Sequence, residues 1–513
     1  MHTGWRDTPF LAAFWVHVLS IAIVAFALGV PAVRRDAARS AASNAGRAPL
    51  DLNADLFFYI LLVACVVGAV ASISFIMILQ RFASSLIYCA LYSSLALQAA
   101  FTVVFFVISP PAGIVMALIL ALQAVYVYCI RKRIAFATAH VKAAVAALQA
   151  HRIVFAVAIA LVFVQVLWVM LWELASLGVQ SAINTAAAGG NGTAALGAPA
   201  APANGTGAAG LFTNSTSSGA GGAVVFAMTV SLYWGTQTFM YASHFVVAAV
   251  VGSWWFTPNA PSPVKEAVRR AFTTNFGSLS LGALIVAVIE ACKRAAQAAH
   301  KAAEKNDAPP AIKVIACLCV CALKCVEDIV EYVNAWAIIF IALTGKGYVA
   351  SARDVWTLFK DRGWTAIIND DLVGPALKIA SLAPAALAAI AGAGICYAWT
   401  SGAANSLAIV LIAAVLSFIV GMTMATIMTG VVTAGVRTIF VCFALNPSAL
   451  AESHPQHFLE LVEAWNAFHP DVFRSSGYDA IKPPGQQGAG VAHSQVVTVH
   501  NPVAGGKGNT YPY

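Results

Sequence analysis

A long stretch of this chain carries almost no charge, and this feature constrains the possible folds more than any other. Between Asp55 and Glu266 the single acidic residue is Glu173. Of the 513 residues 60% are hydrophobic and 10% are charged, against roughly 25% charged in a typical soluble protein. Too few charged side chains remain to cover a water-exposed surface. The composition therefore excludes a soluble enzyme and a disordered chain, and it predicts an all-α, polytopic helical membrane protein.

Apolar runs long enough to cross a bilayer recur along the chain, since a spanning helix needs about 20 apolar residues. The clear runs are Phe10–Val33, Leu56–Leu79, Ser84–Ser109, Ala112–Ile130, Ile153–Gly178, Ala223–Phe256, Ala376–Trp399 and Asn405–Val436. Two weaker runs, Phe276–Ala291 and Val314–Leu343, either span the membrane or lie as cytoplasmic or re-entrant segments. We therefore predict about ten transmembrane helices, a transmembrane domain over residues 1–436, and a cytoplasmic, largely disordered tail over residues 437–513.

One uncharged segment, residues 180–222, sets the expected orientation. Its three Asn-x-Ser/Thr sequons begin at Asn191, Asn204 and Asn214. Chance occurrence in a linker rich in Asn and Thr is the alternative, but the pattern predicts an extracellular or lumenal, glycosylated loop. The basic segment 131–152, one helix earlier, then lies in the cytoplasm, as the positive-inside rule requires. Two other basic segments, 34–47 and 293–313, disagree with this orientation.

Motifs for catalysis or metal binding are missing from the sequence. It contains no phosphate-binding loop, no His-Glu-x-x-His and no Gly-x-Ser-x-Gly. The cysteines at positions 317, 319, 321 and 325 have no histidine nearby, and three of them share one helical face. This spacing favours packed cysteines over a metal site, with S-acylation as the alternative. We predict that the protein is not an enzyme and needs neither a cofactor nor a metal.

Polar residues of the run 223–256 fall on one narrow helical face at 100° per residue. They are Tyr233, Gln237, Tyr241 and His244, with Trp234 beside them. Polar groups in a membrane helix are costly unless they face another helix or a wet cavity. The face is therefore either a set of interhelical hydrogen bonds or a path in which aromatic rings hold a cation. In the second case His244, which belongs to the residue type that titrates near neutral pH, is the candidate for proton coupling.

The preceding apolar run supplies a matching face. Trp168 and Trp172 lie on one side of it, and Glu173 follows directly. Tryptophans near a helix end also occur as interfacial belt residues, which is the alternative here. A carboxylate inside a membrane needs a partner, and a cationic substrate would supply one. Glu290 is a second candidate carboxylate, unless it lies in the headgroup zone beside its basic neighbours.

Several short motifs occur here in a combination that matches one known family. They are Trp5–Phe10, Ser231–Gln237, His244, Gly252–Phe256, Phe276–Leu284, Leu343–Lys346, Ser351–Asp354, Ile368–Leu372 and Thr438–Ala444. Together they resemble the choline transporter-like family. The resemblance implies about ten membrane helices, cytosolic termini, and transport of choline or a related organic cation, with proton-linked exchange in some relatives. Tyr241 stands where relatives usually have Asn, so the amine that fits best is left open.

The sequence thus predicts a multi-pass transporter in the plasma membrane or another eukaryotic endomembrane. Its expected partners are a small choline-like cation, with ethanolamine possible as a substrate, the lipid bilayer and protons, but no nucleic acid. The expected substrate-binding residues are Tyr233, Trp234, Gln237, Tyr241, Trp168, Trp172 and Glu173, and the expected proton-coupling residue is His244. The alternative is a structural or organising membrane protein of the same fold that transports nothing.

Overall fold

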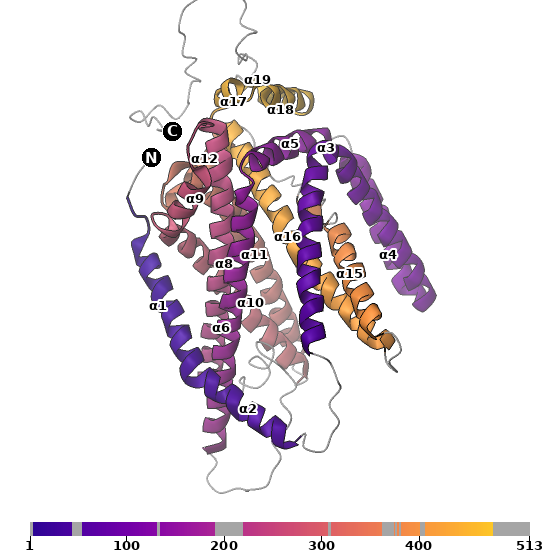
Figure 1. Ribbon diagram of the computed structural model, residues 1–513, viewed down its shortest axis with the longest axis vertical. Coiled ribbons are helices and arrows are strands. Elements are labelled where there is room, and N and C mark those ends of the chain that lie inside the picture. Colours follow the sequence, from indigo (N-terminus) through magenta and orange to yellow (C-terminus); the bar gives the residue numbers. More distant parts are fainter. Residues whose placement is uncertain are drawn as a thin grey trace, which may run out of the picture.

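A computed structural model describes residues 4–43, 54–130, 134–189, 219–305, 309–361, 374, 377–378, 381–400 and 406–475. All regular elements within these ranges are helices, which confirms the predicted all-α class (Figure 1). Eight helical stretches of the described chain are long and apolar enough to cross a membrane. They are Thr8–Arg35, Leu91–Ile108, Pro110–Cys129, Ile153–Thr185, Gly222–Phe256, Phe276–Lys305, Leu382–Trp399 and Ile409–Leu445. The number of about ten crossings stays a prediction.

The helices follow one another closely along the chain. In order they are α1 (Thr8–Val24), the π-helical η1 (Ala25–Gly29), α2 (Val30–Ser43), α3 (Ala54–Ile108), α4 (Pro110–Ile130), α5 (Ile134–Ala150), α6 (Ile153–Gly189), α8 (Gly219–Phe256), α9 (Pro263–Phe272), α10 (Phe276–Lys305), α11 (Pro310–Thr344), α12 (Tyr348–Asp361), α15 (Leu382–Thr400), α16 (Ser406–Leu445), α17 (Ser448–Ser453), α18 (Pro455–Phe468) and α19 (Pro470–Ser475).

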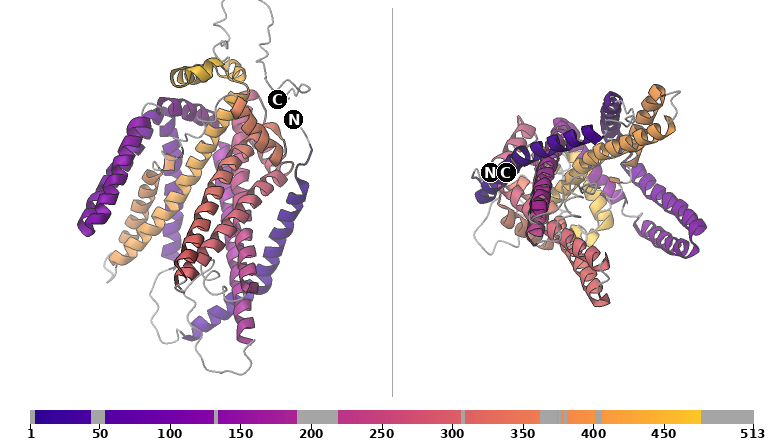
Figure 2. Two further views of the ribbon diagram at one scale, coloured as in Figure 1. Left: turned by 180° about the vertical axis from the view of Figure 1, so that it is seen from behind. Right: turned by 90° about the horizontal axis from the view of Figure 1, so that it is seen from below.

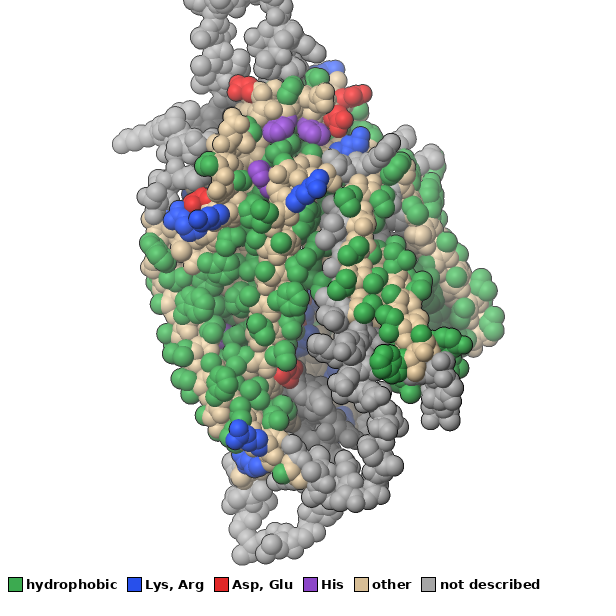
Figure 3. All heavy atoms as spheres, viewed as in Figure 1, with side chains coloured by type: hydrophobic (Ala, Val, Ile, Leu, Met, Phe, Trp, Pro, Cys, Tyr) green, Lys and Arg blue, Asp and Glu red, His purple; other side chains and the backbone are tan. Residues whose placement is uncertain are grey.

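The long helices form a bundle with two distinct ends (Figures 1 and 2). The short helices α5, α9, α12 and α17–α19 lie at one end, at the top of Figure 1, which we call the tail end. Helix α6 ends and α8 begins at the opposite end, which we call the loop end. On the face in Figure 3, hydrophobic side chains form a broad band between the two ends, while most charged side chains gather near them. Such a band is expected of a surface in contact with lipid.

Helix α3 contains both of the predicted runs between residues 56 and 109. Its backbone leaves helical geometry at Phe82, where φ is −123° and ψ is 30°, so two arms meet there. The second arm forms a hairpin with α4, in which the Gln123 amide donates to the Ser94 hydroxyl over 3.0 Å. Figure 2 shows this hairpin standing away from the other helices. Its side chains are largely exposed, as lipid-facing side chains would be.

The two weaker apolar runs correspond to α10 and α11. Helix α10 continues to Lys305, beyond the predicted end at Ala291. Helices α10 and α11 carry more charge than the other long helices, yet the last residues of α11 belong to the buried core and include Asn334. The cysteines between positions 317 and 325 are exposed on α11, so the prediction that they pack inside is wrong. A cysteine on a face turned to lipid needs no protein partner, because it behaves as a small apolar residue.

The predicted boundary after residue 436 falls inside a helix. Helix α16 runs on to Leu445, and the described part of the predicted tail, residues 448–475, forms α17, α18 and α19 against the tail end. The tail is therefore ordered up to Ser475, and its remainder lies outside the described residues. The loop predicted over 180–222 is shortened at both sides by α6 and α8, and all three sequons within it also lie outside the described residues.

Candidate functional site

Two tryptophans of α6 fasten this helix to α8. The indole N–H of Trp168 donates to the Leu232 carbonyl over 3.3 Å, and that of Trp172 donates to the Met228 carbonyl over 2.9 Å. Both side chains are buried. A Cβ at Gly235 of α8 would overlap the Trp168 ring, so glycine is required for this close approach. Both tryptophans thus point into the helix interface and not into an interfacial belt.

Helix α1 adds a histidine that the sequence analysis missed. The ring of His17 stacks on Trp234 at 4.7 Å and lies 5.2 Å from Trp168, and its Nε2 is hydrogen-bonded to the Ser231 hydroxyl at 2.7 Å. Its Nδ1 is buried and has no hydrogen-bond partner within the described part of the chain. The only signal for it was a lone histidine in an apolar run. We call Phe14, His17, Trp168 and Trp234 the aromatic junction.

Trp234 links this junction to α10. Its indole N–H donates to the Ser280 carbonyl over 2.9 Å, and the Phe14 ring meets its ring edge-on at 5.5 Å. The junction therefore joins four helices, namely α1, α6, α8 and α10. All of its polar atoms except one nitrogen of His17 have partners on these helices.

The other predicted residues of α8 face α10, α11 and α16. The Tyr233 hydroxyl accepts a hydrogen bond from Arg294 over 2.8 Å, and the Tyr241 hydroxyl accepts one from the Asn334 amide over 3.1 Å. Gln237 lies between them along the helix, and its buried Oε1 lacks a partner among the described residues. His244 lies within electrostatic range of Arg437 on α16.

The structure therefore divides the predicted binding residues into two groups. Tyr233, Gln237 and Tyr241 belong to the interface of α8 with α10 and α11, whereas Trp168 and Trp234 meet at the aromatic junction. Glu173 belongs to neither group. Its side chain is partly exposed, and within the described ranges no hydrogen bond or ion pair reaches its carboxylate.

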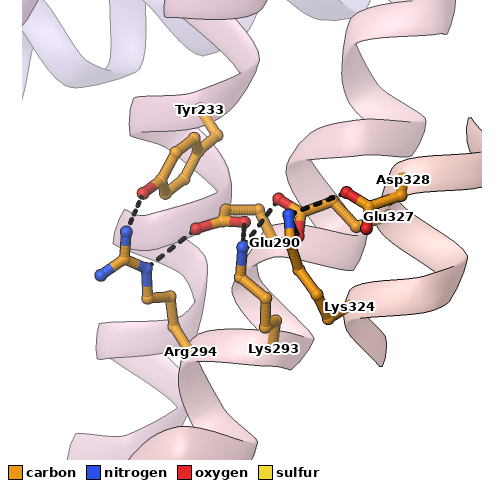
Figure 4. A network of polar contacts seen from close by, with 7 residues as sticks. All are labelled: Tyr233, Glu290, Lys293, Arg294, Lys324, Glu327 and Asp328. Atoms are coloured by element: carbon orange, nitrogen blue, oxygen red, sulfur yellow. Dashed lines mark hydrogen bonds and ion pairs between the residues drawn. The ribbon is translucent and has the colours of Figure 1, made fainter. Parts of the chain in front are cut away.

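A network of ion pairs connects α10 and α11 next to Tyr233 (Figure 4). The Lys293 ammonium contacts the Glu290 carboxylate and lies 2.7 Å from each carboxylate oxygen of Glu327. These three side chains are 11%, 5% and 7% exposed. Arg294 donates to Glu290 over 2.9 Å, and Lys324 lies 3.2 Å from Glu327. Every buried charge thus has an opposite charge beside it, as burial requires.

The centre of this network is buried, whereas its outer members Arg294, Lys324 and Asp328 are exposed or half-exposed. Glu290 occupies the midpoint of the 30-residue helix α10 and is buried inside the protein. The network contains two of the five Lys and Arg residues of the segment 293–313, which disagreed with the positive-inside rule. Lys293 and Arg294 neutralise acids inside the bundle, so they do not act as loop charges.

The opening motif Trp5–Phe10 holds the tail end together. The Asp7 carboxylate accepts hydrogen bonds from the Ser278 hydroxyl over 2.6 Å and from the Tyr348 backbone N–H over 3.0 Å. Asp7 adopts a left-handed conformation with φ of 49°, and a Cβ at Gly277 would overlap its backbone. Asp7 therefore joins the starts of α1, α10 and α12.

Comparison with known proteins supports a single family. Residues 114–448 match the family model described as plasma-membrane choline transporter. The chain is 35% identical to protein PNS1 of Gibberella zeae over 244 residues, which cover 46% of this chain and 44% of that protein. It is 29% identical to PNS1 of Neurospora crassa over 360 residues, covering 69% and 61% of the two chains. A CTL-like protein of Dictyostelium discoideum is 28% identical over 235 residues, covering 45% and 40%.

The aligned regions thus span about half the length of these relatives, from 40% to 61%. The family model, in contrast, covers more than half of this chain. Together with the membrane-compatible helices, this match confirms the resemblance found in the sequence motifs. The chain is a multi-pass membrane protein that belongs to the choline transporter-like family.

Proposed function

We propose that this protein transports a small organic cation of the choline or ethanolamine class across the plasma membrane or another endomembrane. The observation that carries the proposal is the pairing of Lys293 with Glu290 and Glu327 in the middle of the bundle. An ammonium group held between two buried carboxylates is the chemistry that a cationic substrate needs. Family membership supports the same class of substrate.

Lys293 acts in this proposal as an internal competitor of the substrate. Its ammonium contacts both carboxylates, so a shift of Lys293 toward Glu327 would leave one Glu290 oxygen available to a second cation, while Arg294 keeps the other oxygen. The Tyr233 ring, which already has the Arg294 guanidinium 5.9 Å from its centroid, offers a cation–π face at this place. A quaternary ammonium has no N–H to donate, so a carboxylate and aromatic faces are the groups that can hold it.

The remaining predicted residues have distinct roles in the proposed path. Tyr233, Gln237 and Tyr241 contact the substrate beside α10 and α11. Trp168 and Trp234 of the aromatic junction form a second cation site beside His17, Trp172 lies one helical turn from Trp168, and the Glu173 carboxylate attracts cations. His244 couples protons to substrate movement, since histidine is the side chain that changes charge near neutral pH.

Uptake of labelled choline and ethanolamine into liposomes that contain the purified full-length protein tests the proposal. We expect saturable uptake of at least one amine, changed by an imposed pH gradient. The alternative function, a structural membrane protein, is favoured by the tryptophan hydrogen bonds that fasten α6 to α8. Thermal unfolding verifies that the purified protein is folded. If such folded protein shows no saturable flux of either amine under any pH gradient, the result would support that alternative.

A further inference from the structure

Helix α18 is anchored to the tail end by one tryptophan. Trp465 is fully buried, stacks on Phe443 of α16 at 5.4 Å, and meets Phe136 of α5 edge-on at 5.0 Å. Its indole N–H donates to Nε2 of His140 over 3.2 Å. The predicted tail thus inserts its largest side chain between two other helices of the protein.

The contacts of His140 determine which of its nitrogens carries the proton. Nδ1 lies 2.9 Å from the Phe136 carbonyl, which can only accept a hydrogen bond, so the hydrogen is on Nδ1. Nε2 is then the acceptor for the indole of Trp465. The imidazole stacks on Phe440 at 4.0 Å and is completely buried. A second proton would place an N–H on Nε2 directly against the indole N–H, with no acceptor between them.

The neighbouring helix α17, together with His454 between α17 and α18, contacts α8. His454 stacks on Trp254 at 3.9 Å, and the Ser453 hydroxyl donates to the Trp255 carbonyl over 3.3 Å. The Trp255 indole in turn donates to the Asn446 carbonyl at the end of α16 over 2.9 Å. Helices α17 and α18 therefore connect the tail ends of α5, α8 and α16 (Figure 1).

Few charges face His140 from the helices around it. Among the described residues, the titratable group with an electrostatic effect on His140 is His469, which directly follows α18 and whose ring lies 5.3 Å from Phe136. Farther along, His457 of α18 is influenced by Glu460 on its own helix and by Lys142 of α5. The α16 side presents the apolar ring of Phe440.

We propose that α17 and α18 form a proton-sensitive clamp, which holds the tail ends of α5, α8 and α16 together while His140 is neutral and releases them when His140 is protonated. Transport by alternating access would require these ends to separate, and this consequence rests on the proposed function. The clamp itself does not, because its opening can be measured without substrate.

The sign of the pH effect follows from burial. Burial lowers the pKa of His140 from 6.5 to about 4 in the docked state. A histidine with a lowered pKa supports docking fully above about 6.5, and this support is lost as the pH falls toward 4. With a pKa of 6.5 for His140 in the released state and about 4 in the docked state, the equilibrium constant for docking falls about tenfold between pH 7.5 and pH 5.5.

Hydrogen exchange of the full-length protein in lipid nanodiscs, corrected for the intrinsic pH dependence of amide exchange, measures the clamp. We expect the protection of residues 455–468 to fall about tenfold from pH 7.5 to pH 5.5. In H140Q the amide can still donate to Phe136 and accept from Trp465 but does not titrate, so the pH dependence should shrink to the contribution of His454 and His457, whose pKa values burial also lowers. H300Q, on α10 away from the clamp, should behave as the wild type.

W465F gives a second, independent arm. Phenylalanine keeps an aromatic ring but has no N–H for His140, so protection of α18 at pH 7.5 should fall while that of α8 stays unchanged. Three results would overturn the proposal: equal protection at both pH values in the wild type, a wild-type pH dependence in H140Q, or unchanged protection of α18 in W465F. None of them bears on whether the protein transports an amine.

Discussion

Lys293 of α10 and Glu327 of α11 form a buried, bidentate ion pair in which the ammonium lies 2.7 Å from both carboxylate oxygens. The pair joins two helices whose membrane-spanning character is weakest in the sequence. Because Glu290 contacts the same ammonium, the three residues form one electrostatic unit. Their substitution effects should therefore depend on one another.

A double-mutant cycle tests this unit. K293M leaves Glu290 and Glu327 without their shared cation, and removal of one partner of a buried ion pair costs about 3–5 kcal/mol. In the double variant K293M/E327Q no isolated charge is left at position 327, so its loss of stability should be smaller than the sum of the two single losses. Thermal unfolding of the purified proteins measures this. Additive losses would show that the two side chains do not interact.

The role of Glu290 in transport is a separate question. We expect E290Q to raise the apparent KM for choline, because the amide cannot attract a cation, while Arg294 and Lys293 stay close to it. D328N is the matched control, since this side chain belongs to the same network but is 60% exposed. Uptake per folded molecule is the measurement. Equal KM values in E290Q and D328N would remove Glu290 from the substrate path.

The proposed proton-coupling role of His244 can be tested by substitution. His244→Gln keeps a polar side chain that cannot change charge near neutral pH, so the pH dependence of uptake should flatten with little effect on KM. His17→Gln serves as the comparison, because His17 is the other histidine in the middle of the bundle and has an unpartnered nitrogen. A normal pH profile in His244→Gln together with a flat one in His17→Gln would transfer the role to His17.

Helix packing at the aromatic junction has a simple steric test. G235A adds a methyl group that would overlap the Trp168 ring, and such overpacking costs about 1–3 kcal/mol. G222A is the control on the same helix, because an added Cβ there has no atom within 4 Å. Thermal unfolding should separate the two variants. A G235A protein as stable as G222A would contradict the close approach of α6 and α8.

The orientation is tested by the sequons. Endoglycosidase treatment of the protein from a eukaryotic host should increase its gel mobility, and the triple variant N191Q/N204Q/N214Q should migrate faster without treatment. In Figure 1, α1 begins at the tail end and α18 lies there too, whereas α6 ends at the opposite loop end. The first and last described helices therefore lie on the side of the bundle that faces away from the sequon loop. An unchanged band would mean that none of the three sequons is used.

Sequence alone determined the class and the family of this protein. A membrane-spanning run depends only on consecutive apolar residues, so hydropathy located α1, α4, α6, α8, α15 and α16 without any knowledge of their neighbours. The combination of motifs was sufficient to identify the family, because such motifs can be read directly from the sequence. The face of α8 with Tyr233 and Tyr241 was also predictable, since helical periodicity is a local property.

Only the tertiary structure decided which polar groups meet. Lys293 and Arg294 appeared to be loop charges because the second acid of their network, Glu327, stands on the next helix. His17 gave no periodic signal, and its aromatic neighbours come from α6 and α8. Trp465 was assigned to a disordered tail because the polar sequence around it does not reveal the pocket formed by α5 and α16. Pairing of buried polar groups depends on distances between helices, and local sequence does not contain those distances.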